Sequence, residues 1–376
     1  MSAFAGSRRT ADISTLARLL SGLHLDGLLL MGIAVTMSIG TLAVYSAVGQ
    51  NDALVVNQLT RMAAALIAML IMAQLDPAWL RRLSPWVYMA GLALLGLVLV
   101  SGDVGGGAQR WLDLGVRFQP SEVMKLGVPL MVAWVLHDRP LPPSFLMILS
   151  CLALIMIPVA LIALQPDLGT AIMITASGGA AIFLAGIGVR YLLGAAASAL
   201  VALPALWYFV MHDYQKRRVL TLFNPDSDPL GAGYHIIQSK IAIGSGGLFG
   251  KGWLNGTQGQ LEFLPERSTD FIFAVIGEEF GLLGALTVLL VYLAIVGRGL
   301  YIAATAQETF GRLLAGSISL TFFFYVFVNT GMVTGLLPVV GVPLPLISMG
   351  GTSMVTLLAG FGILMSIQTH RKLLAR

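Results

Sequence analysis

The sequence predicts an all-α, polytopic membrane protein with about ten transmembrane helices and one long extracytoplasmic loop before the eighth. Of its 376 residues, 57% are hydrophobic and only 11% are charged. The mean hydropathy of +0.86 lies well above that of soluble globular chains. Apolar runs that could each cross about 30 Å of hydrocarbon recur along the chain. We therefore expect residues 1–376 to form a single integral membrane domain.

The predicted spans are apolar runs separated by short stretches that contain Pro, Gly or charged residues. The first run is too long for the core of a cleaved signal peptide, so we expect it to be retained as an anchor. In chain order, the spans lie near residues 25–48, 56–75, 84–101, 121–137, 144–164, 167–187, 189–210, 270–297, 311–335 and 343–367.

Basic residues in the short loops predict the orientation, because loops rich in Lys and Arg stay in the cytoplasm. We expect both termini to be cytoplasmic, since this places most basic residues of the short segments inside. Residues 1–24 then form a cytoplasmic N-terminal tail, either as an interfacial amphipathic helix or as a disordered basic segment. Residues 211–269 form a large extracytoplasmic loop. The inner basic residues are Arg8, Arg9, Arg18, Arg81, Arg82, Arg139, Arg190, Arg298, Arg312, Arg371, Lys372 and Arg376.

The charge distribution, the single cysteine and the few histidines argue against a nucleic-acid partner, a disulfide bond and a zinc site. The pI of about 9.3 follows from the loop bias, so we expect no nucleic-acid partner. Cys151 is the single cysteine and lies within a predicted span, so no intrachain disulfide can form. His212 and His235 have no second histidine at ligand spacing, which argues against a zinc site.

Three acidic residues lie at the starts of predicted spans that begin outside. Glu122, Asp167 and Asp270 occur at the starts of the fourth, sixth and eighth spans, so the topology places them at one membrane face. A carboxylate next to hydrocarbon loses hydration that a partner, water or an ion must replace. Asp270 is the strongest functional candidate, because it joins a polar loop to a seam of small residues where another helix could pack closely. The seam consists of Ala274, Gly277, Gly281 and Gly284.

The same membrane face also collects groups that could bind an anion. Helix N-termini carry unpaired amides and partial positive charge, and Lys125 lies three residues after Glu122. Carboxylates beside such groups suit a phosphate-bearing lipid, with a divalent cation such as Mg²⁺ or Mn²⁺ between them. Hydroxyl residues near the outer end of the last span permit polar contacts within the membrane. The further cavity candidates are Arg110, Arg217, Arg218, Lys240, Ser348 and Ser353.

Each acid also has a purely structural interpretation. A first-turn acid stabilises any helix through the helix dipole, and Asp167 could simply cap its helix. Glu122 and Lys125 could form a buried ion pair with no role in chemistry. We expect Glu278 and Glu279, deeper in the eighth span, to make structural hydrogen bonds.

Several motifs resemble the signature sequences of the SEDS family, named for shape, elongation, division and sporulation. The main motif runs from Pro265 to Glu279 and contains Asp270. Ser268 and Met349 depart from residues that are common in the family, but neither change removes an acid. The resemblance covers nearly the whole chain. The other matching segments are residues 119–122, 165–170, 224–225, 341–345 and 348–353.

The resemblance is closer to the elongation members of the family than to the division members, through residues 233–244 and 261–265. It implies a ten-helix fold and an inverting peptidoglycan glycosyltransferase that polymerises lipid II at the outer face of the cytoplasmic (inner) membrane. This activity would serve cell elongation and rod shape. The resemblance also implies a class B penicillin-binding protein, a transpeptidase, as partner, together with other membrane proteins of the elongation complex.

By the same resemblance, Asp270 is the key catalytic residue, and the positions of Glu122, Lys125 and Asp167 are functionally important. Asp270 could act as the general base on the acceptor sugar or hold a divalent cation. Two other functions fit the sequence, namely a lipid II flippase and a non-catalytic scaffold of wall-synthesis proteins. A transporter tends to place its substrate near the membrane midplane between repeated halves. Here the acids gather at one face and no internal repeat is found.

Overall fold

The computed structural model describes residues 22–105, 108–113, 117–211, 213–228, 231–261 and 263–370. Within these residues, ten helices correspond to the ten predicted spans, which confirms the fold class. Eight of them are long and apolar enough to cross a membrane, whereas α5 and α7 are shorter. The ten are α2 (Gly27–Ala47), α3 (Asp52–Gln74), α4 (Pro77–Ser101), α5 (Ser121–Leu136), α6 (Phe145–Leu164), α7 (Leu168–Leu184), α8 (Val189–Ala205), α12 (Ile272–Thr305), α13 (Thr309–Val333) and α14 (Thr352–Thr369).

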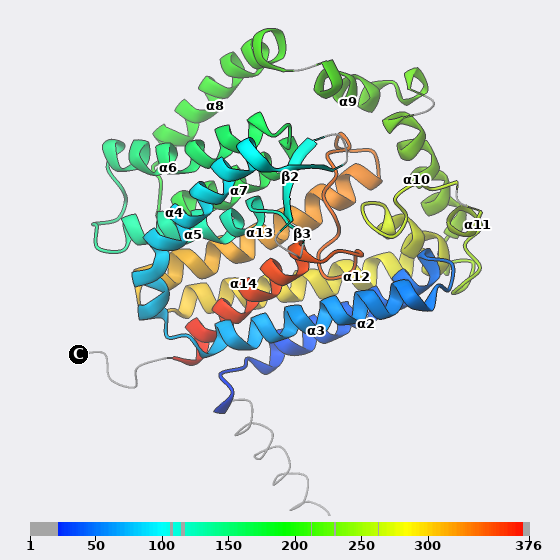
Figure 1. The fold of residues 1–376 in the computed structure, drawn as a ribbon, viewed down its shortest axis with the longest axis horizontal. Coiled ribbons are helices and arrows are strands. Elements are labelled where there is room, and N and C mark those ends of the chain that lie inside the picture. Colours follow the sequence, from blue (N-terminus) through cyan, green and yellow to red (C-terminus); the bar gives the residue numbers. More distant parts are fainter. Residues whose placement is uncertain are drawn as a thin grey trace, which may run out of the picture.

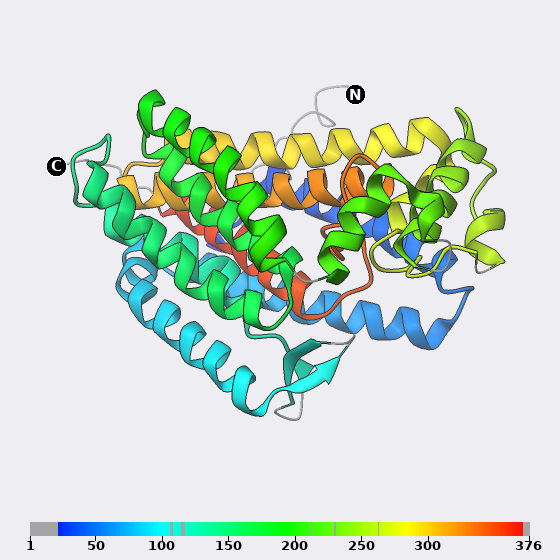
Figure 2. The ribbon, with the colours of Figure 1, turned by 90° about the horizontal axis from the view of Figure 1, so that it is seen from above.

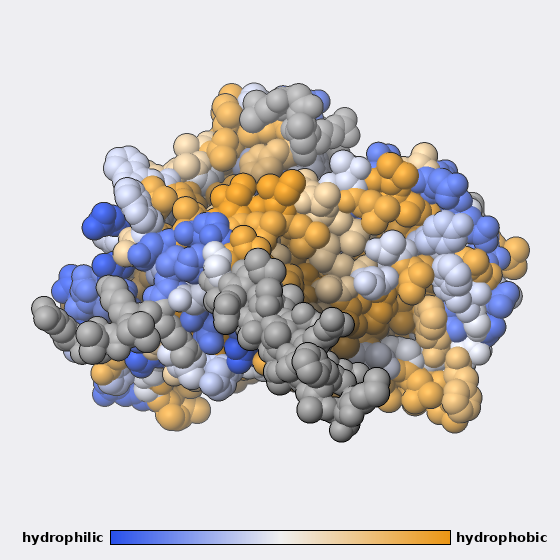
Figure 3. All heavy atoms as spheres, turned by 90° about the horizontal axis from the view of Figure 1, so that it is seen from below, coloured by the Kyte–Doolittle hydropathy of each residue, from blue (hydrophilic) through white to orange (hydrophobic). Residues whose placement is uncertain are grey.

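Most of these helices lie side by side along the long axis of the molecule (Figures 1 and 2). Helix α3 packs on α14, and α12 packs on both α2 and α13. Helix α8 stands at the edge of the bundle in Figure 1, and none of its residues is buried. Figure 3 shows hydrophobic residues gathered around the middle of the long axis and hydrophilic residues toward both ends. This distribution suits a multi-pass protein whose middle lies in hydrocarbon and whose ends lie in water.

Both ends of the described chain lie at the same end of the bundle. The rings of His24 and His370 stack with their centroids 4.0 Å apart. This agrees with termini on one side of the membrane, while their cytoplasmic location stays a prediction. Of the predicted N-terminal tail, residues 1–24, the first 21 lie outside the described residues.

Three helix boundaries lie seven or more residues from the predicted ones, and one of them is the end of α12, at Thr305 rather than near residue 297. Helix α4 begins at Pro77, seven residues early, because the Asp76 side chain accepts a hydrogen bond from Ala78 N at 2.7 Å and caps the helix there. Helix α14 begins at Thr352, so residues 343–351, which were predicted as part of the span, form a loop. Two prolines and two glycines in this stretch disfavour a helix.

The connecting segments contain more secondary structure than the sequence suggested. The loop after α4, expected to be irregular, holds a small antiparallel sheet of three strands in the order β1-β2-β3. The long loop 211–269 is largely helical within its described residues, and α10 packs against α12. These elements are β1 (Asp103–Gly105), β2 (Ala108–Asp113), β3 (Arg117–Phe118), η1 (Leu206–Val210), α9 (Asp213–Phe223), η2 (Pro225–Ser227), α10 (Ala232–Gly246) and α11 (Thr257–Gln260).

The first part of α12 is held by α10 and the loop that follows it. At Gly281 the backbone leaves helical geometry, with φ 65° and ψ −163°, so the predicted seam does not continue along one regular helix. The predicted close approach of another helix to this seam is nevertheless confirmed. Helix α10 comes so near to α12 that a Cβ added at Gly246 would lie 2.0 Å from the Gly277 carbonyl oxygen. Glu278 makes structural hydrogen bonds as expected, including one of 2.6 Å from Lys251 Nζ.

We expect the Gly281→Ala substitution to destabilise the fold by about 1–3 kcal/mol. Alanine would have to adopt a φ of 65°, which L-residues avoid, and its Cβ would lie 2.3 Å from Gly250 N. Thermal unfolding of the purified protein measures the effect. Gly297→Ala on the same helix is the control, because a Cβ there meets no atom of the described residues within 4 Å, apart from its chain neighbours and the nearby backbone of its own helix. Equal melting temperatures for the two variants would contradict this interpretation.

Candidate active site

A cavity of about 190 Å³ lies where α5, α7 and α14 begin. Strand β2, helix α13 and the loop before α14 complete its wall, and Ser353 lines it as well. The predicted convergence of the acids at the starts of the fourth and sixth spans is therefore observed. The charged residues that line the cavity are Arg110, Glu122, Lys125 and Asp167.

Glu122 and Lys125 form a buried ion pair at the start of α5. Lys125 Nζ lies 2.6 Å from Glu122 Oε1, and it also lies 5.0 Å from the centre of the Tyr325 ring. A spacing of three residues places both charged side chains on the same helix face. Among the described residues, the buried Glu122 Oε2 has no hydrogen-bond partner. One carboxylate oxygen therefore remains for water or a ligand.

Asp167 caps α7 and also pairs with a base of the cavity wall. Its Oδ1 accepts a hydrogen bond from Thr170 N at 3.2 Å, and its Oδ2 lies 3.5 Å from Arg110. Gln119 Nε2 donates to the same Oδ2 at 3.0 Å. Asp167 thus caps its helix, as the sequence suggested, and it also forms an ion pair with Arg110.

Asp270 lies next to this cavity rather than in its wall. It belongs to the turn two residues before α12, and a Cβ added at the cavity-lining Gly341 would lie 3.4 Å from Asp270 Oδ2. Burial raises the pKa of Asp270 from 3.8 to about 6. Repulsion from Glu266 adds to the rise, and attraction to Arg218 opposes it. A carboxyl group with a pKa near neutral pH is suited to accept a proton during a reaction.

Of the three basic candidates in the long loop, Arg218 lies near the site, whereas Arg217 and Lys240 do not line the cavity. Arg218 on α9 is close enough to Asp270 to act on its pKa. Arg217 on the same helix and Lys240 on α10 are exposed and do not line the cavity. Lys240 lies instead against Gly335, at the end of α13.

Buried polar side chains support the turn that carries Asp270. Ser348 Oγ donates to the Thr269 carbonyl oxygen at 2.6 Å, so Ser348 holds this turn and does not line the cavity. Asn329 on α13 donates to the Asp270 carbonyl oxygen at 2.8 Å. Asn329 and Tyr325 are not part of the predicted site. The signal was nevertheless available, because the two polar residues lie one turn apart in an apolar span.

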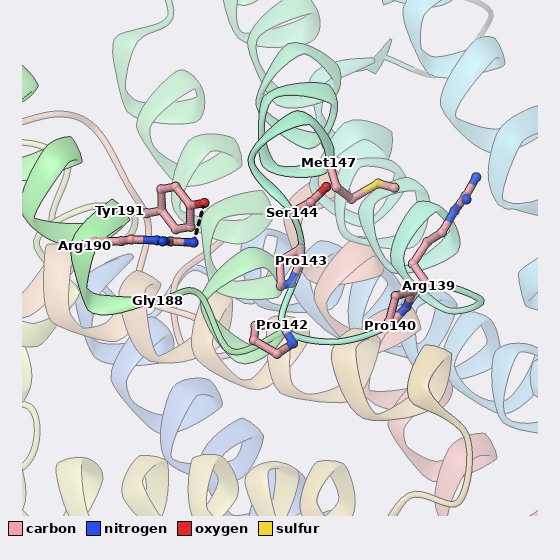
Figure 4. Close-up of a pocket in the computed structure, with 9 residues that line it drawn as sticks. All are labelled: Arg139, Pro140, Pro142, Pro143, Ser144, Met147, Gly188, Arg190 and Tyr191. Atoms are coloured by element: carbon pink, nitrogen blue, oxygen red, sulfur yellow. Dashed lines mark hydrogen bonds between the residues drawn. The ribbon is translucent and has the colours of Figure 1, made fainter.

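A larger cavity, of about 410 Å³, lies at the other end of the bundle (Figure 4). It is lined by the loops before α6 and α8, beyond the C-terminal end of α5, whereas the acids lie at the N-terminal end of α5. In Figure 4, Arg190 lies against Tyr191, with a hydrogen bond of 3.0 Å between them. No carboxylate or imidazole is among its described lining residues. Among the described lining residues, Tyr191 is the only side chain of a type used for general acid–base catalysis, and it already bonds to Arg190.

The family model for the FtsW, RodA and SpoVE cell cycle proteins matches residues 20–373. The chain belongs to the SEDS family. It is 53% identical to the peptidoglycan glycosyltransferase MrdB of Escherichia coli strain K12. The 355 aligned residues cover 94% of this chain and 96% of that protein. It is 38% identical over 364 residues to the probable peptidoglycan glycosyltransferase FtsW of Trichlorobacter lovleyi, which covers 92% of this chain and 93% of that protein.

Solved structures share this SEDS fold. A chain of a peptidoglycan synthase complex that coordinates polymerization and crosslinking matches with a TM-score of 0.80 and 34% identity, over 91% of this chain and 97% of that chain. The rod shape determining protein RodA of Thermus thermophilus matches with a TM-score of 0.70 and 30% identity, over 92% of this chain and 98% of that chain. The resemblance to elongation members of the SEDS family is thereby confirmed.

Proposed function

We propose that this SEDS protein is a peptidoglycan glycosyltransferase that polymerises lipid II for cell elongation and rod shape. The 53% identity to a peptidoglycan glycosyltransferase over 94% of the chain supports the reaction class. The observation that carries the proposal is Asp270, a carboxyl group with a raised pKa beside a cavity lined by acids and bases. We expect the site to face the outside of the cytoplasmic membrane, with both termini in the cytoplasm.

In the proposed reaction, Asp270 is the general base. It takes the proton from the 4-hydroxyl group of the acceptor N-acetylglucosamine, and that oxygen bonds to the anomeric carbon of the donor N-acetylmuramic acid. The bond from this carbon to undecaprenyl pyrophosphate breaks, and its electron pair leaves with the pyrophosphate. Attack from the face opposite the leaving group inverts the anomeric configuration.

Basic side chains of the cavity would stabilise the departing pyrophosphate. Arg110 and Lys125 lie in the cavity wall, and each already has a carboxylate partner. An incoming diphosphate would therefore share these bases with Asp167 and Glu122. The paired carboxylates would hold the bases in place before the substrate arrives.

A divalent cation, Mg²⁺ or Mn²⁺, would supply further positive charge at the pyrophosphate. In the described part of the chain, no three or more His, Cys, Asp or Glu side chains form a cluster that could hold a metal ion. In the alternative role, in which Asp270 holds the cation instead of taking the proton, it and the nearby Glu266 would do so only together with oxygen ligands from the substrate or water. Two carboxylates alone would bind the cation weakly, so its binding would depend on the substrate.

A transpeptidase partner would cross-link the new glycan strands. The similar chain in the peptidoglycan synthase complex, which coordinates polymerization and crosslinking, supports such a partner. We propose a class B penicillin-binding protein for this role, within an elongation complex that contains other membrane proteins. Polymer synthesis from lipid II, measured with and without this partner and with divalent cations chelated, tests both requirements.

The polymerisation rate should fall as the pH is lowered through about 6, because protonated Asp270 cannot accept the acceptor's proton. Initial rates measured from about pH 5 to about pH 8 test this expectation. In the Glu266→Gln variant the repulsion that raises the pKa of Asp270 is lost, so the midpoint should move to lower pH. A rate that is constant across this range in the wild type would argue against Asp270 as the base.

A further inference from the structure

The region where Asp270 meets the cavity is built from two segments that are far apart in the sequence. Asp270 lies in the turn before α12, whereas residues 341–343, in the loop between α13 and α14, line the cavity. The chain between them includes all of α12 and α13, so covalent continuity does not set their separation. Noncovalent contacts must therefore determine how far the carboxylate lies from the cavity.

Asn329 joins these two segments through a single amide group. Its Nδ2 donates to the Asp270 carbonyl oxygen at 2.8 Å and to the Val342 carbonyl oxygen at 2.7 Å. The Asn329 side chain is fully buried. Val342 directly follows Gly341, whose Cβ position lies 3.4 Å from Asp270 Oδ2. The bridge thus lies next to a residue of the cavity wall that the Asp270 carboxylate approaches.

Two further hydrogen bonds strengthen the same junction without involving Asp270. Ser348 Oγ donates to the Thr269 carbonyl oxygen at 2.6 Å. Met349 N donates to the Ser268 carbonyl oxygen at 2.8 Å. These contacts are loop to loop, whereas Asn329 connects both segments to a third element, α13.

Helix α13 also carries Tyr325, which lines the cavity one turn before Asn329. Both residues are buried, and a spacing of four places them on the same helix face. One rigid helix therefore contacts the cavity through Tyr325 and the Asp270 turn through Asn329.

We propose that Asn329 is a positioning residue that sets the distance between the Asp270 carboxylate and the substrate cavity. This inference rests on the proposed glycosyltransferase function. The amide is required because its two N–H groups serve two carbonyl oxygens at once, whereas leucine has no donor and ionised aspartate only accepts. Asn329 itself does not line the cavity. Its loss should therefore slow turnover and leave the affinity for lipid II unchanged.

Kinetics of the Asn329→Leu and Asn329→Asp variants with lipid II test the proposal. We expect kcat to fall ~100-fold in both with KM unchanged, as for other displacements of about 1 Å at a reacting group. In Asn329→Asp the buried carboxyl group can donate one hydrogen bond at most, and only when protonated, so it cannot serve both carbonyl oxygens. Ser319→Ala is the control, since it removes a buried hydroxyl that, among the described residues, bonds within α13 to the Ala315 carbonyl oxygen. It should keep the wild-type kcat and pH profile.

A wild-type kcat in both variants, or a raised KM with unchanged kcat, would overturn the positioning role. If neither variant folds, Asn329→Gln takes their place, because it keeps the amide but moves it outward by one methylene group. A lower kcat would then support the proposal, and a wild-type kcat would overturn it. The wild type measured in parallel distinguishes a failure of the proposed function from a failure of the Asn329 role. Absence of polymer from the wild type refutes the proposed function, whereas an active wild type with fully active variants refutes only the role of Asn329.

Discussion

Asp270→Asn should abolish polymer synthesis and leave the protein folded. Asparagine has the shape of aspartate but cannot accept the proton of the acceptor hydroxyl group. General-base catalysis contributes roughly 10²–10⁴-fold to enzymatic rates, so we expect turnover to fall by about 1000-fold. The measurement is the initial rate of glycan formation from lipid II by purified variant and wild type, each with the transpeptidase partner present.

Thermal stability distinguishes lost catalysis from a lost fold in this variant. The pKa of Asp270 rises from 3.8 to about 6 on folding, so ionising this carboxyl group disfavours the folded state. That cost grows as the pH rises from about 4 through about 6 and is complete above it. Asparagine removes the cost, so the melting temperature at about pH 8 should equal or exceed that of the wild type. The control Asp138→Asn, which changes an exposed carboxylate after the C-terminal end of α5, should polymerise lipid II. Wild-type turnover in Asp270→Asn would rule out the base role.

Lys125→Met should destabilise the protein and also impair its activity. The substitution leaves the Glu122 carboxylate buried without its 2.6 Å partner. Breaking a buried ion pair in this way typically costs about 3–5 kcal/mol. The change also removes a positive charge from the cavity, so lipid II affinity and turnover should both decrease. Melting temperature, lipid II binding and polymerisation rate are the three readouts.

Two further variants separate the contributions of Lys125. Adding Glu122→Gln to Lys125→Met removes the unpaired charge, so the double variant should regain stability but not activity. Arg81→Met breaks a more exposed pair, with Glu308 at 3.3 Å, and should cost no more than about 1 kcal/mol. Unchanged stability, affinity and turnover in Lys125→Met would show that the pair is dispensable.

The helices were predictable because hydrocarbon requires long apolar runs, and this requirement leaves a strong signal in the sequence. The same signal misassigned residues 343–351, which are apolar but are not helical. Their prolines prevent regular hydrogen bonding, and Ser348 Oγ accepts a bond from Leu344 N instead. The short strands after α4 were missed as well, since glycine-rich segments carry little periodicity.

The acids of the site were predictable because they lie at helix starts in a sequence with few charges. The pairing of Glu122 with Lys125 was predictable from their spacing of three residues. The contact between Arg110 and Asp167 was not, since it depends on how the segment that contains β2 folds. The bridge from Asn329 to Asp270 likewise depends on the path of a loop. Local patterns therefore locate charged residues in the chain, whereas the tertiary fold determines which of them meet.

The most direct test of the central claim uses the purified wild-type protein with its transpeptidase partner in lipid vesicles that contain labelled lipid II. Glycan strands and released undecaprenyl pyrophosphate are measured together with movement of lipid II between the two leaflets. We predict strands whose number of new glycosidic bonds matches the pyrophosphate released, and loss of both products in Asp270→Asn. Movement of lipid II between leaflets with neither product would contradict the account and identify a flippase, and the absence of all three signals would indicate a scaffold.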